Sequence, residues 1–486
     1  AETLHVIHQT GTTVYRPIPC STAPDIDGCL VGDHHRLLLH PDPMPTDSAA
    51  RRVWGHRDLE GSRLFGDAEV LVEISGVATM QRCVGGRRIG TPCKGDDSCP
   101  SSTCASTIVV ADRARSRIVV QRKPASENGS AFDFALGQPD LKSAECNAGG
   151  RSAGTLCEPA GVTFDAEGNL WVADRGNHRV LRFPREFISG SAADRVIGQP
   201  DFETAESGTG NTQLRAPADV AFDPDADILF VADTSNHRIV RFDRPAEDGV
   251  ADAVIGQPGP DDSEAGLTSD GTACDRLNGP LSLAVDAAAR RVWVTDTVNN
   301  RLLAFGYDPK GGVETAAAIL HGQPDCATKF EGQVDASSIG KGSGGVWFFG
   351  EDPQGVCITD ELAHRVLCWR DRRKAATTGP VTPPADFILG QEGPTQHRPN
   401  RGGDVGADTL NGPSFGSWAA RGRRAGALFV ADTDNHRIQV YAPPYATGMQ
   451  AAASIGRKAG AAAECGPAGT CEPNAAKADP DGNLWV

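Results

Sequence analysis

The hydrophobic residues of this chain occur in short runs that are separated by turn residues. The clearest stretch has four such runs, at residues 219–223, 228–233, 237–242 and 251–256. Aspartate, proline, asparagine and serine lie between them, and these residues stabilise tight turns because they preset φ or bond the local backbone. The pattern predicts a module of four antiparallel strands joined by hairpins.

The module recurs along the chain, and two short motifs mark each copy. The first motif begins with an aspartate after a hydrophobic strand, and its copies start at Asp33, Asp112, Asp174, Asp233, Asp296, Asp360 and Asp432. The second is a Gly-Gln-Pro corner, which starts at Gly137, Gly198, Gly256 and Gly322, with degenerate forms at Gly55, Gly390 and Gly456. Both motifs therefore indicate seven modules.

A single four-stranded sheet would leave one face exposed to solvent. The modules must therefore pack against one another around an axis. We therefore expect an all-β chain in which residues 1–486 form one β-propeller, with seven blades and with six or eight as alternatives. Residues 479–486 begin another module, while the first module has no clear inner strand. We expect the N- and C-terminal segments to pair and close the ring, which removes exposed sheet edges. A chain that continues beyond Val486 is the alternative.

The core Asp-x-x-Asn-His-Arg is similar to the NHL repeat, and recognisable copies run from residue 29 to 486. The chain resembles NHL-repeat β-propellers, specifically a secreted bacterial type with Gly-Gln-Pro-Asp corners. NHL rings usually have six blades and shorter units. Equivalent residues of different blades lie far apart, whereas a catalytic site needs unlike residues that converge. We therefore expect the repeated residues to be structural: Asp174, Asn177, His178, Arg179, Asp233, Asn236, His237, Arg238, Asp432, Asn435, His436 and Arg437.

Fourteen cysteines indicate disulfide bonds, because most of them occur in close pairs and no CxxC occurs with paired histidines. Cys357 and Cys368 flank one turn symmetrically, so we expect them to face each other on a hairpin. Residues 83–104 are expected to be a disulfide-rich insertion within a blade, with a plain solvated loop as the alternative. The predicted disulfide residues are Cys20, Cys29, Cys83, Cys93, Cys99, Cys104, Cys146, Cys157, Cys274, Cys326, Cys357, Cys368, Cys465 and Cys471.

Disulfides predict an oxidising location, which is secreted, cell-surface or periplasmic. No apolar run is long enough to span a bilayer and no leader opens the chain, so we expect a mature protein whose signal peptide has been removed. The formal net charge of −16 disfavours nucleic acid as a partner, because such binding depends on lysine and arginine.

The sequence predicts no catalytic residue and no cofactor. It contains no P-loop, no G-x-S-x-G motif and no H-E-x-x-H motif. Two turns, at residues 223–227 and 479–483, place oxygens at alternate positions as calcium loops do. They lack the bidentate glutamate of an EF-hand, so hairpin turns are the favoured interpretation and calcium the alternative.

Two functions follow from these observations. The favoured one is a non-enzymatic scaffold that binds a protein or glycan through loops on one propeller face, since loops on a rigid frame commonly carry function. The alternative is a metal-dependent enzyme of the lactonase or lyase type with a site in the central channel. Trp347, Phe348, Phe349 and Trp418 would form a sugar platform if exposed, and packed core if not.

Overall fold

The computed structural model describes most of residues 74–456 and six short strands outside that range. The undescribed stretches within the range are 84–88, 94–97, 100–103, 123–131, 267–273, 330–333, 341–342, 351–353, 373–382, 419–425 and 436. The outer strands are β1 (His5–His8), β2 (Gly11–Val14), β3 (Leu37–His40), β4 (Arg52–Trp54), β29 (Lys477–Ala478) and β30 (Leu484–Trp485).

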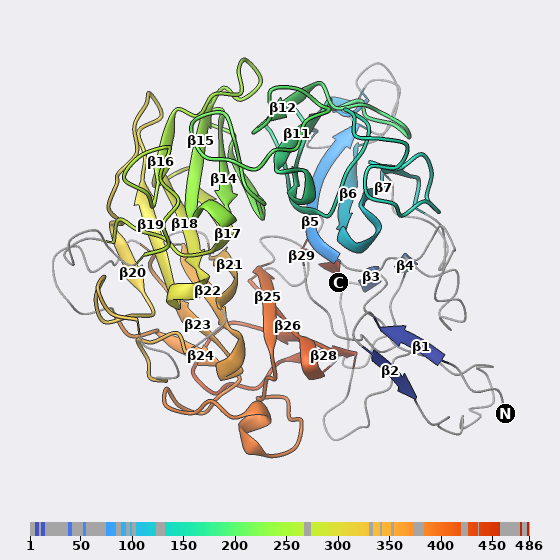
Figure 1. Ribbon diagram of the computed structural model, residues 1–486. Coiled ribbons are helices and arrows are strands. Elements are labelled where there is room, and N and C mark those ends of the chain that lie inside the picture. The colour runs from blue at the N-terminus through green and yellow to red at the C-terminus, as the bar shows by residue number, and fades with distance from the viewer. Residues whose placement is uncertain are drawn as a thin grey trace, which may run out of the picture.

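Six four-stranded antiparallel sheets stand around a common axis as the blades of a propeller (Figure 1). Each blade uses four consecutive strands, and the blades are numbered 1 to 6 in chain order. Blade 1 has β5 (Ile74–Cys83), β6 (Cys104–Asp112), β7 (Arg117–Gln121) and β8 (Phe134–Leu136). Blade 2 has β9 (Pro159–Phe164), β10 (Leu170–Asp174), β11 (Arg179–Phe183) and β12 (Arg195–Ile197).

The other four blades repeat this order, with the first strand innermost. Blade 3 has β13 (Asp219–Asp223), β14 (Ile228–Asp233), β15 (Arg238–Asp243) and β16 (Ala253–Ile255). Blade 4 has β17 (Pro280–Asp286), β18 (Arg291–Asp296), β19 (Arg301–Gly306) and β20 (Ile319–His321). Blade 5 has β21 (Ser343–Phe349), β22 (Gly355–Asp360), β23 (Arg365–Trp369) and β24 (Phe387–Leu389). Blade 6 has β25 (Pro413–Trp418), β26 (Leu428–Asp432), β27 (Arg437–Tyr441) and β28 (Ala453–Gly456).

The hydrophobic core lies between neighbouring blades. One cluster joins Val109 and Val120 of blade 1 to Val172 and Leu181 of blade 2, and similar clusters join each later pair of consecutive blades up to blade 6. A central strand such as β14 is therefore buried along its whole length, because each of its faces meets another blade. No helix in the described part of the chain has the length and hydrophobicity to cross a bilayer.

The sequence predicted seven blades, and the structure shows six, so the predicted number is matched only in part. The first anchor, Asp33, lies outside the described residues. A further four-stranded sheet joins the two ends of the chain in the order β29, β30, β3, β4. In it Leu39 lies opposite Trp485, which is the terminal pairing that the incomplete modules predicted. The strands of this sheet lie between blade 6 and blade 1 (Figure 1).

The Gly-Gln-Pro corners need glycine for two reasons. In blades 1 to 5 this residue has a φ between 85° and 95°, a conformation that side chains with a Cβ rarely adopt. A Cβ there would also collide with the next blade; at Gly256 it would lie 2.5 Å from the Leu277 Cδ1 atom. The corner glycine therefore sets both the exit of the outer strand and the packing of the loop that follows.

Five disulfide bonds connect described cysteines. Cys357 and Cys368 face each other on neighbouring strands, as the sequence predicted. The others are Cys83–Cys99, Cys93–Cys104, Cys146–Cys157 and Cys274–Cys326. Strand β5 ends at Cys83 and β6 begins at Cys104, so the cysteine cluster connects the first two strands of blade 1. Cys20, Cys29, Cys465 and Cys471 lie outside the described residues.

Candidate interaction face

The repeated aspartate and arginine form a buried ion pair at one end of every blade. In blade 2, the Arg179 Nε atom donates to the Asp174 Oδ2 atom at 2.7 Å, and neither side chain is exposed. The guanidinium group also donates to the carbonyls of Ser152 and Thr155 in the incoming loop. The equivalent pairs are Asp112–Arg117, Asp233–Arg238, Asp296–Arg301, Asp360–Arg365 and Asp432–Arg437.

The remaining acceptor positions of the aspartate are filled by backbone and asparagine donors. The Cys157 amide donates to Asp174 Oδ1 at 2.7 Å, and Asn177 Nδ2 donates to Oδ2 at 2.8 Å. Asn236 and Asn435 make the same bond to Asp233 and Asp432. A buried charge is tolerated only when it is paired and hydrogen-bonded, and this network meets both conditions.

The repeated histidine connects one blade to the next. His178 has a φ of 55° and closes the 3-10 turn that follows the anchor aspartate. Its Nδ1 atom accepts a hydrogen bond from the Ala216 amide of blade 3 at 3.1 Å. His237 and His364 accept in the same way from Gly279 and Gly412. An Nδ1 atom that accepts a hydrogen bond belongs to a neutral ring with its proton on Nε2. This interblade hydrogen bond therefore depends on an unprotonated histidine.

These contacts give the repeated residues a structural role. Asp174, Asn177, His178 and Arg179 of blade 2 each bond to a loop or to a neighbouring blade, and blade 3 repeats the pattern. In blade 6, His436 lies outside the described residues. None of these side chains converges with its counterparts in other blades, because each network is confined to its own blade and the next.

The six 3-10 turns that directly follow the anchor aspartates lie at the same end of the blades, and together they define a surface that we call the turn face. They are η3 (Arg113–Arg115), η4 (Arg175–Asn177), η5 (Thr234–Asn236), η6 (Thr297–Asn299), η7 (Glu361–Ala363) and η9 (Thr433–Asn435). The first two residues of each turn vary in charge and size from blade to blade, although the flanking residues repeat. The variation indicates that the architecture does not fix these two positions.

Exposed aliphatic side chains gather on the turn face of blades 4 and 5. Val298 and Leu362 occupy the second position of η6 and η7 and are 46% and 54% exposed. Leu281, which is 42% exposed, follows Pro280, and Pro280 pairs with the anchor Asp296 at this end of the blade. Among the described residues only Ile188 and Val250 are other large hydrophobics with such exposure.

Arginines gather on the same face in blades 1 to 3. Glu158 bridges Arg113 and Arg175 at 3.7 and 3.1 Å. Arg215 is exposed and has no ion-pair partner among the residues that the structure describes. Sequence reasoning missed these residues and the exposed aliphatics, because it followed what repeats. The sequence did contain a signal for them, because the two positions between the anchor aspartate and the asparagine vary from one repeat to the next.

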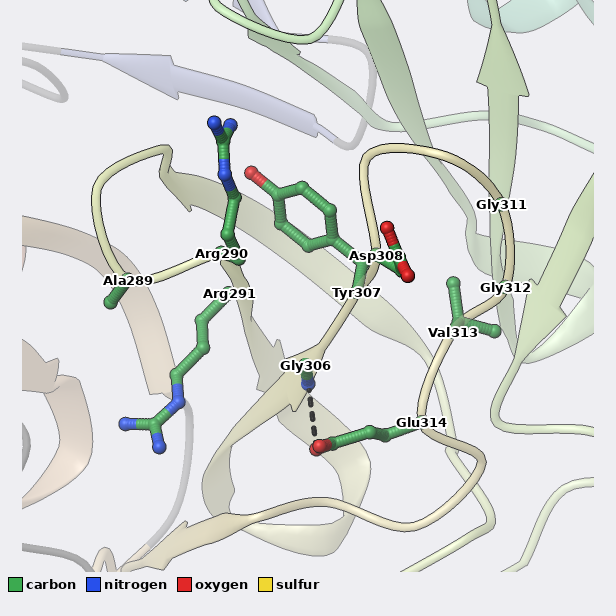
Figure 2. A pocket seen from close by; sticks show the side chains of 10 residues that line it. All are labelled: Ala289, Arg290, Arg291, Gly306, Tyr307, Asp308, Gly311, Gly312, Val313 and Glu314. Atoms are coloured by element: carbon green, nitrogen blue, oxygen red, sulfur yellow. Dashed lines mark hydrogen bonds between the residues drawn. The ribbon is translucent and has the colours of Figure 1, made fainter.

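A cavity of about 520 Å³ lies at the opposite end of blade 4, beside the β17–β18 turn (Figure 2). Three of its polar side chains, those of Tyr307, Arg290 and Glu314, are paired with blade 3 or with the backbone of blade 4. Tyr307 donates to the buried Asp223 at 2.7 Å, and Arg290 contacts the same carboxylate at 2.9 Å. Glu314 accepts from the Gly306 amide at 3.0 Å. Burial raises the pKa of Tyr307, and the bond from Tyr307 to Asp223 joins blade 4 to blade 3.

The same contacts bear on the calcium alternative. Asp223 Oδ1 accepts from the Asp225 amide at 2.9 Å, while Oδ2 contacts Tyr307 and Arg290. Both oxygens thus bond within the protein, as in a hairpin turn. The other candidate turn, at residues 479–483, lies outside the described residues. In the described part of the chain, three potential metal ligands come together at Cys83, Cys93 and Cys99, and all three are in disulfides.

The candidate sugar platform is packed in the core. Trp347 and Phe349 are 6% and 5% exposed and belong to the cluster between blades 5 and 6. Phe348 and Trp418 are partly buried against the two clusters of blade 5. The four rings therefore do not form an exposed surface.

The described geometry agrees with a family model. The NHL-repeat model matches residues 156–183 and 214–242, which cover the first three strands of blades 2 and 3. A mouse peptidyl-glycine alpha-amidating monooxygenase is 28% identical over 153 residues, or 31% of this chain and 14% of that protein. The rat peptidylglycine alpha-amidating monooxygenase is 26% identical over the same length. The chain thus spans a small part of these relatives.

Several solved structures are similar to the chain at low identity. A virginiamycin B lyase from Staphylococcus aureus is 11% identical, with a TM-score of 0.39, covering 75% of this chain and 84% of that one. A suspected 6-phosphogluconolactonase from Bacteroides uniformis is 13% identical, with a TM-score of 0.47, covering 93% and 99%. Likeness at this level carries no functional argument.

Proposed function

Because the chain is an NHL-repeat β-propeller, we propose that it is a non-enzymatic scaffold that binds a protein partner through its turn face. The observation that carries the proposal is the exposure of Leu281, Val298 and Leu362 on one face. Exposed apolar side chains that cluster beside polar ones are typical of protein interaction surfaces. Two of the three occupy turn positions that the architecture leaves free to vary.

The composition of the face favours a protein over a glycan. Carbohydrate recognition commonly uses exposed aromatic rings, and the rings that the sequence offered for this purpose are largely buried. A face that carries aliphatic side chains on some blades and arginines on others suits the mixed apolar and charged surface of a polypeptide. Five disulfides support a location outside the cytoplasm, so we propose an extracellular or periplasmic partner.

The proposal is tested by changing the face without touching the core. Val298→Glu and Leu362→Glu place charge on exposed aliphatic positions, and Ile188→Glu makes the same change at the opposite end of blade 2, where Ile188 is 56% exposed. Proteins retained from the extracellular fraction of the source organism, identified by cross-linking and mass spectrometry, should be lost with the first two variants and kept with the third. Equal retention by all three would contradict the proposal.

A bound metal ion would distinguish the alternative function, a metal-dependent enzyme, from the scaffold. The lactonase-like or lyase-like alternative requires an ion in the channel that is held by unrepeated side chains. Metal analysis of purified protein distinguishes the two functions: stoichiometric calcium or zinc that survives dialysis would contradict a non-enzymatic scaffold.

We also propose that the sheet β29–β30–β3–β4 closes the ring as a seventh blade. Strand β29 contacts β25, the inner strand of blade 6, as the inner strands of consecutive blades contact each other elsewhere. Its four strands also pair in the antiparallel order of the other blades. Closure by both ends of the chain would cover the free edges of the sheets.

A further inference from the structure

The turn face between blades 2 and 3 concentrates positive charge around one histidine. Arg151 bonds through Nε to Asn177 Oδ1 at 3.1 Å and through Nη1 to the Glu203 carbonyl at 2.8 Å. These two bonds hold its guanidinium group next to the residue that precedes His178. Arg175 begins the turn that His178 closes, so both arginines belong to the immediate surroundings of this histidine.

Arg215 approaches from the neighbouring blade. Its own amide donates to Asp233 at 2.7 Å, and the next residue, Ala216, donates to His178 Nδ1 at 3.1 Å. The backbone that carries Arg215 is therefore fixed against the histidine ring. Because Nδ1 accepts this bond, the neutral ring carries its proton on Nε2, which remains available as a donor.

The equivalent histidines do not have such surroundings. Burial lowers the pKa of His178, and the guanidinium groups of Arg215, Arg175 and Arg151 lower it further. Burial also lowers the pKa of His237 and His364, but there carboxylates raise it, from Asp296 at the first and from Asp434 and Asp360 at the second, and a single cationic or ionisable neighbour lowers it further, Arg215 at the first and His397 at the second. The repeat therefore supplies the histidine in several blades, and the charge around it is particular to blades 2 and 3.

This concentration of arginines is notable in a chain with a formal charge of −16. A guanidinium group offers a planar fork of donors that matches a carboxylate, and such charge-assisted bonds are stronger than neutral ones. Glu158 neutralises part of the charge by bridging Arg113 and Arg175, but it lies on the blade 1 side of the cluster. Arg215 and Arg151 remain to receive an external anion.

We propose that Arg151, Arg175, Arg215 and His178 form a binding site for the carboxylate groups of an acidic segment in a protein partner. The inference rests on the proposed function, because it assigns the chemistry recognised by one part of the turn face. The exposed aliphatic residues of blade 4 lie beside blade 3 on the same face. The Thr234 hydroxyl of blade 3 donates to the carbonyl of Pro280 at 2.7 Å, and Leu281 is the next residue. A peptide with acidic residues followed by apolar ones would match both regions.

The test uses a fluorescein-labelled octaglutamate peptide and fluorescence anisotropy at low ionic strength. The double variant R151Q/R215Q removes two charges, and Arg244→Gln removes one exposed arginine that pairs with Glu247 away from this cluster. We expect the wild type and the Arg244→Gln control to bind alike, and R151Q/R215Q to bind at least tenfold more weakly. Thermal unfolding checks that all three proteins are folded.

Three outcomes would overturn the assignment. The first is no binding of the peptide by the wild type, and the second is equal binding by R151Q/R215Q. In the third, an oligogalacturonate binds at these residues while the peptide does not, which would assign the site to a glycan carboxylate. If the peptide fails while Val298→Glu and Leu362→Glu still abolish partner retention, the anion site is wrong and the proposed function stands.

Discussion

Some positions of the repeat have a structural role in every blade, whereas others have no structural role and vary in residue type. The anchor pair Asp233–Arg238 is fully buried, and the arginine also donates to the carbonyls of Gly210 and Gln213. The variable position two residues after the anchor holds Ser235 in the same blade, but Val298 in the next. Buried charge therefore explains why some residues repeat, and exposure explains why others differ.

Removing one partner of a buried pair should be costly. Arg238→Ala leaves the Asp233 carboxylate buried without its counter-charge and leaves loop carbonyls without a donor. We expect a loss of about 3–5 kcal/mol in the free energy of unfolding, measured by denaturant titration. Arg244→Gln, which breaks an exposed pair, should cost less than about 1 kcal/mol. Similar losses in the two variants would show that the buried pair contributes little.

A second residue, His321, should make the protein sensitive to acid. It is fully buried between Trp293 and Trp369, with ring centroids 6.0 and 4.0 Å away, and neither ring nitrogen has a hydrogen-bond partner among the residues that the structure describes. Burial lowers its pKa to about 3. Because the unfolded chain takes up the proton first, near pH 6.5, the free energy of unfolding should fall as the pH drops from about 6.5 toward 3.

Leucine stands at the corresponding position in blades 1 and 5, as Leu136 and Leu389, so His321→Leu is a conservative test. Unfolding measured across this pH range should show a smaller acid-induced loss in the variant, by an amount on the order of a few kcal/mol. The variant should also be at least as stable at pH 7, because it removes an unsatisfied buried polar group. An unchanged pH profile would exclude His321 as a cause of acid sensitivity.

At the level of elements, the corner between blades combines backbone conformation with packing. Gly256 and Gly190 both have positive φ, at 88° and 75°, but only at Gly256 would a Cβ meet other atoms. Gly190→Ala should therefore cost about 1 kcal/mol from backbone strain alone. Gly256→Ala should cost a further 1–3 kcal/mol, roughly, from the collision with Leu277. Calorimetric unfolding measures both, and equal effects would mean that Leu277 moves aside freely.

The strands of blade 3 show what the sequence could and could not predict. The predicted runs at 219–223 and 228–233 coincide with β13 and β14. The third strand begins at Arg238, one residue late, because His237 takes a left-handed conformation to close the 3-10 turn. The outer strand is shorter than predicted and spans Ala253–Ile255. Hydrophobic alternation predicts where strands lie, but local turn geometry sets their ends.

The candidate face was less accessible to sequence reasoning than the strands were. Exposure of Leu281 depends on which residues of neighbouring blades cover it, and no local pattern contains that information. The approach of Arg215 to His178 likewise depends on a hydrogen bond between residues 38 positions apart, in different blades. Repetition revealed the scaffold, but the candidate site lies where the repeat is broken.

On the scale of the whole molecule, six blades packed through interblade clusters need a contact that joins the last blade to the first. The sheet β29–β30–β3–β4 provides the pairing of Leu39 with Trp485 between the two ends of the chain. If this sheet closes the ring, each interblade cluster is stabilised indirectly, because blades 1 and 6 cannot separate without breaking it. Opening would otherwise begin at these two blades. Without the terminal sheet, the inner strands β5 and β25 would each have a neighbouring blade on one side only.

Removing residues 477–486 therefore tests the closure. We expect the truncated protein to unfold several degrees lower and to be cleaved faster by a protease than the intact chain, with the first cuts in blades 1 and 6, since local opening sets the rate of cleavage. A matched control keeps the length and replaces only Trp485, which pairs with Leu39 between the two ends of the chain, with serine. An intermediate loss in Trp485→Ser would attribute part of the closure to the residue at this position of the strand pair. Unchanged stability and cleavage in the truncated protein would mean that the six blades hold together without the terminal sheet.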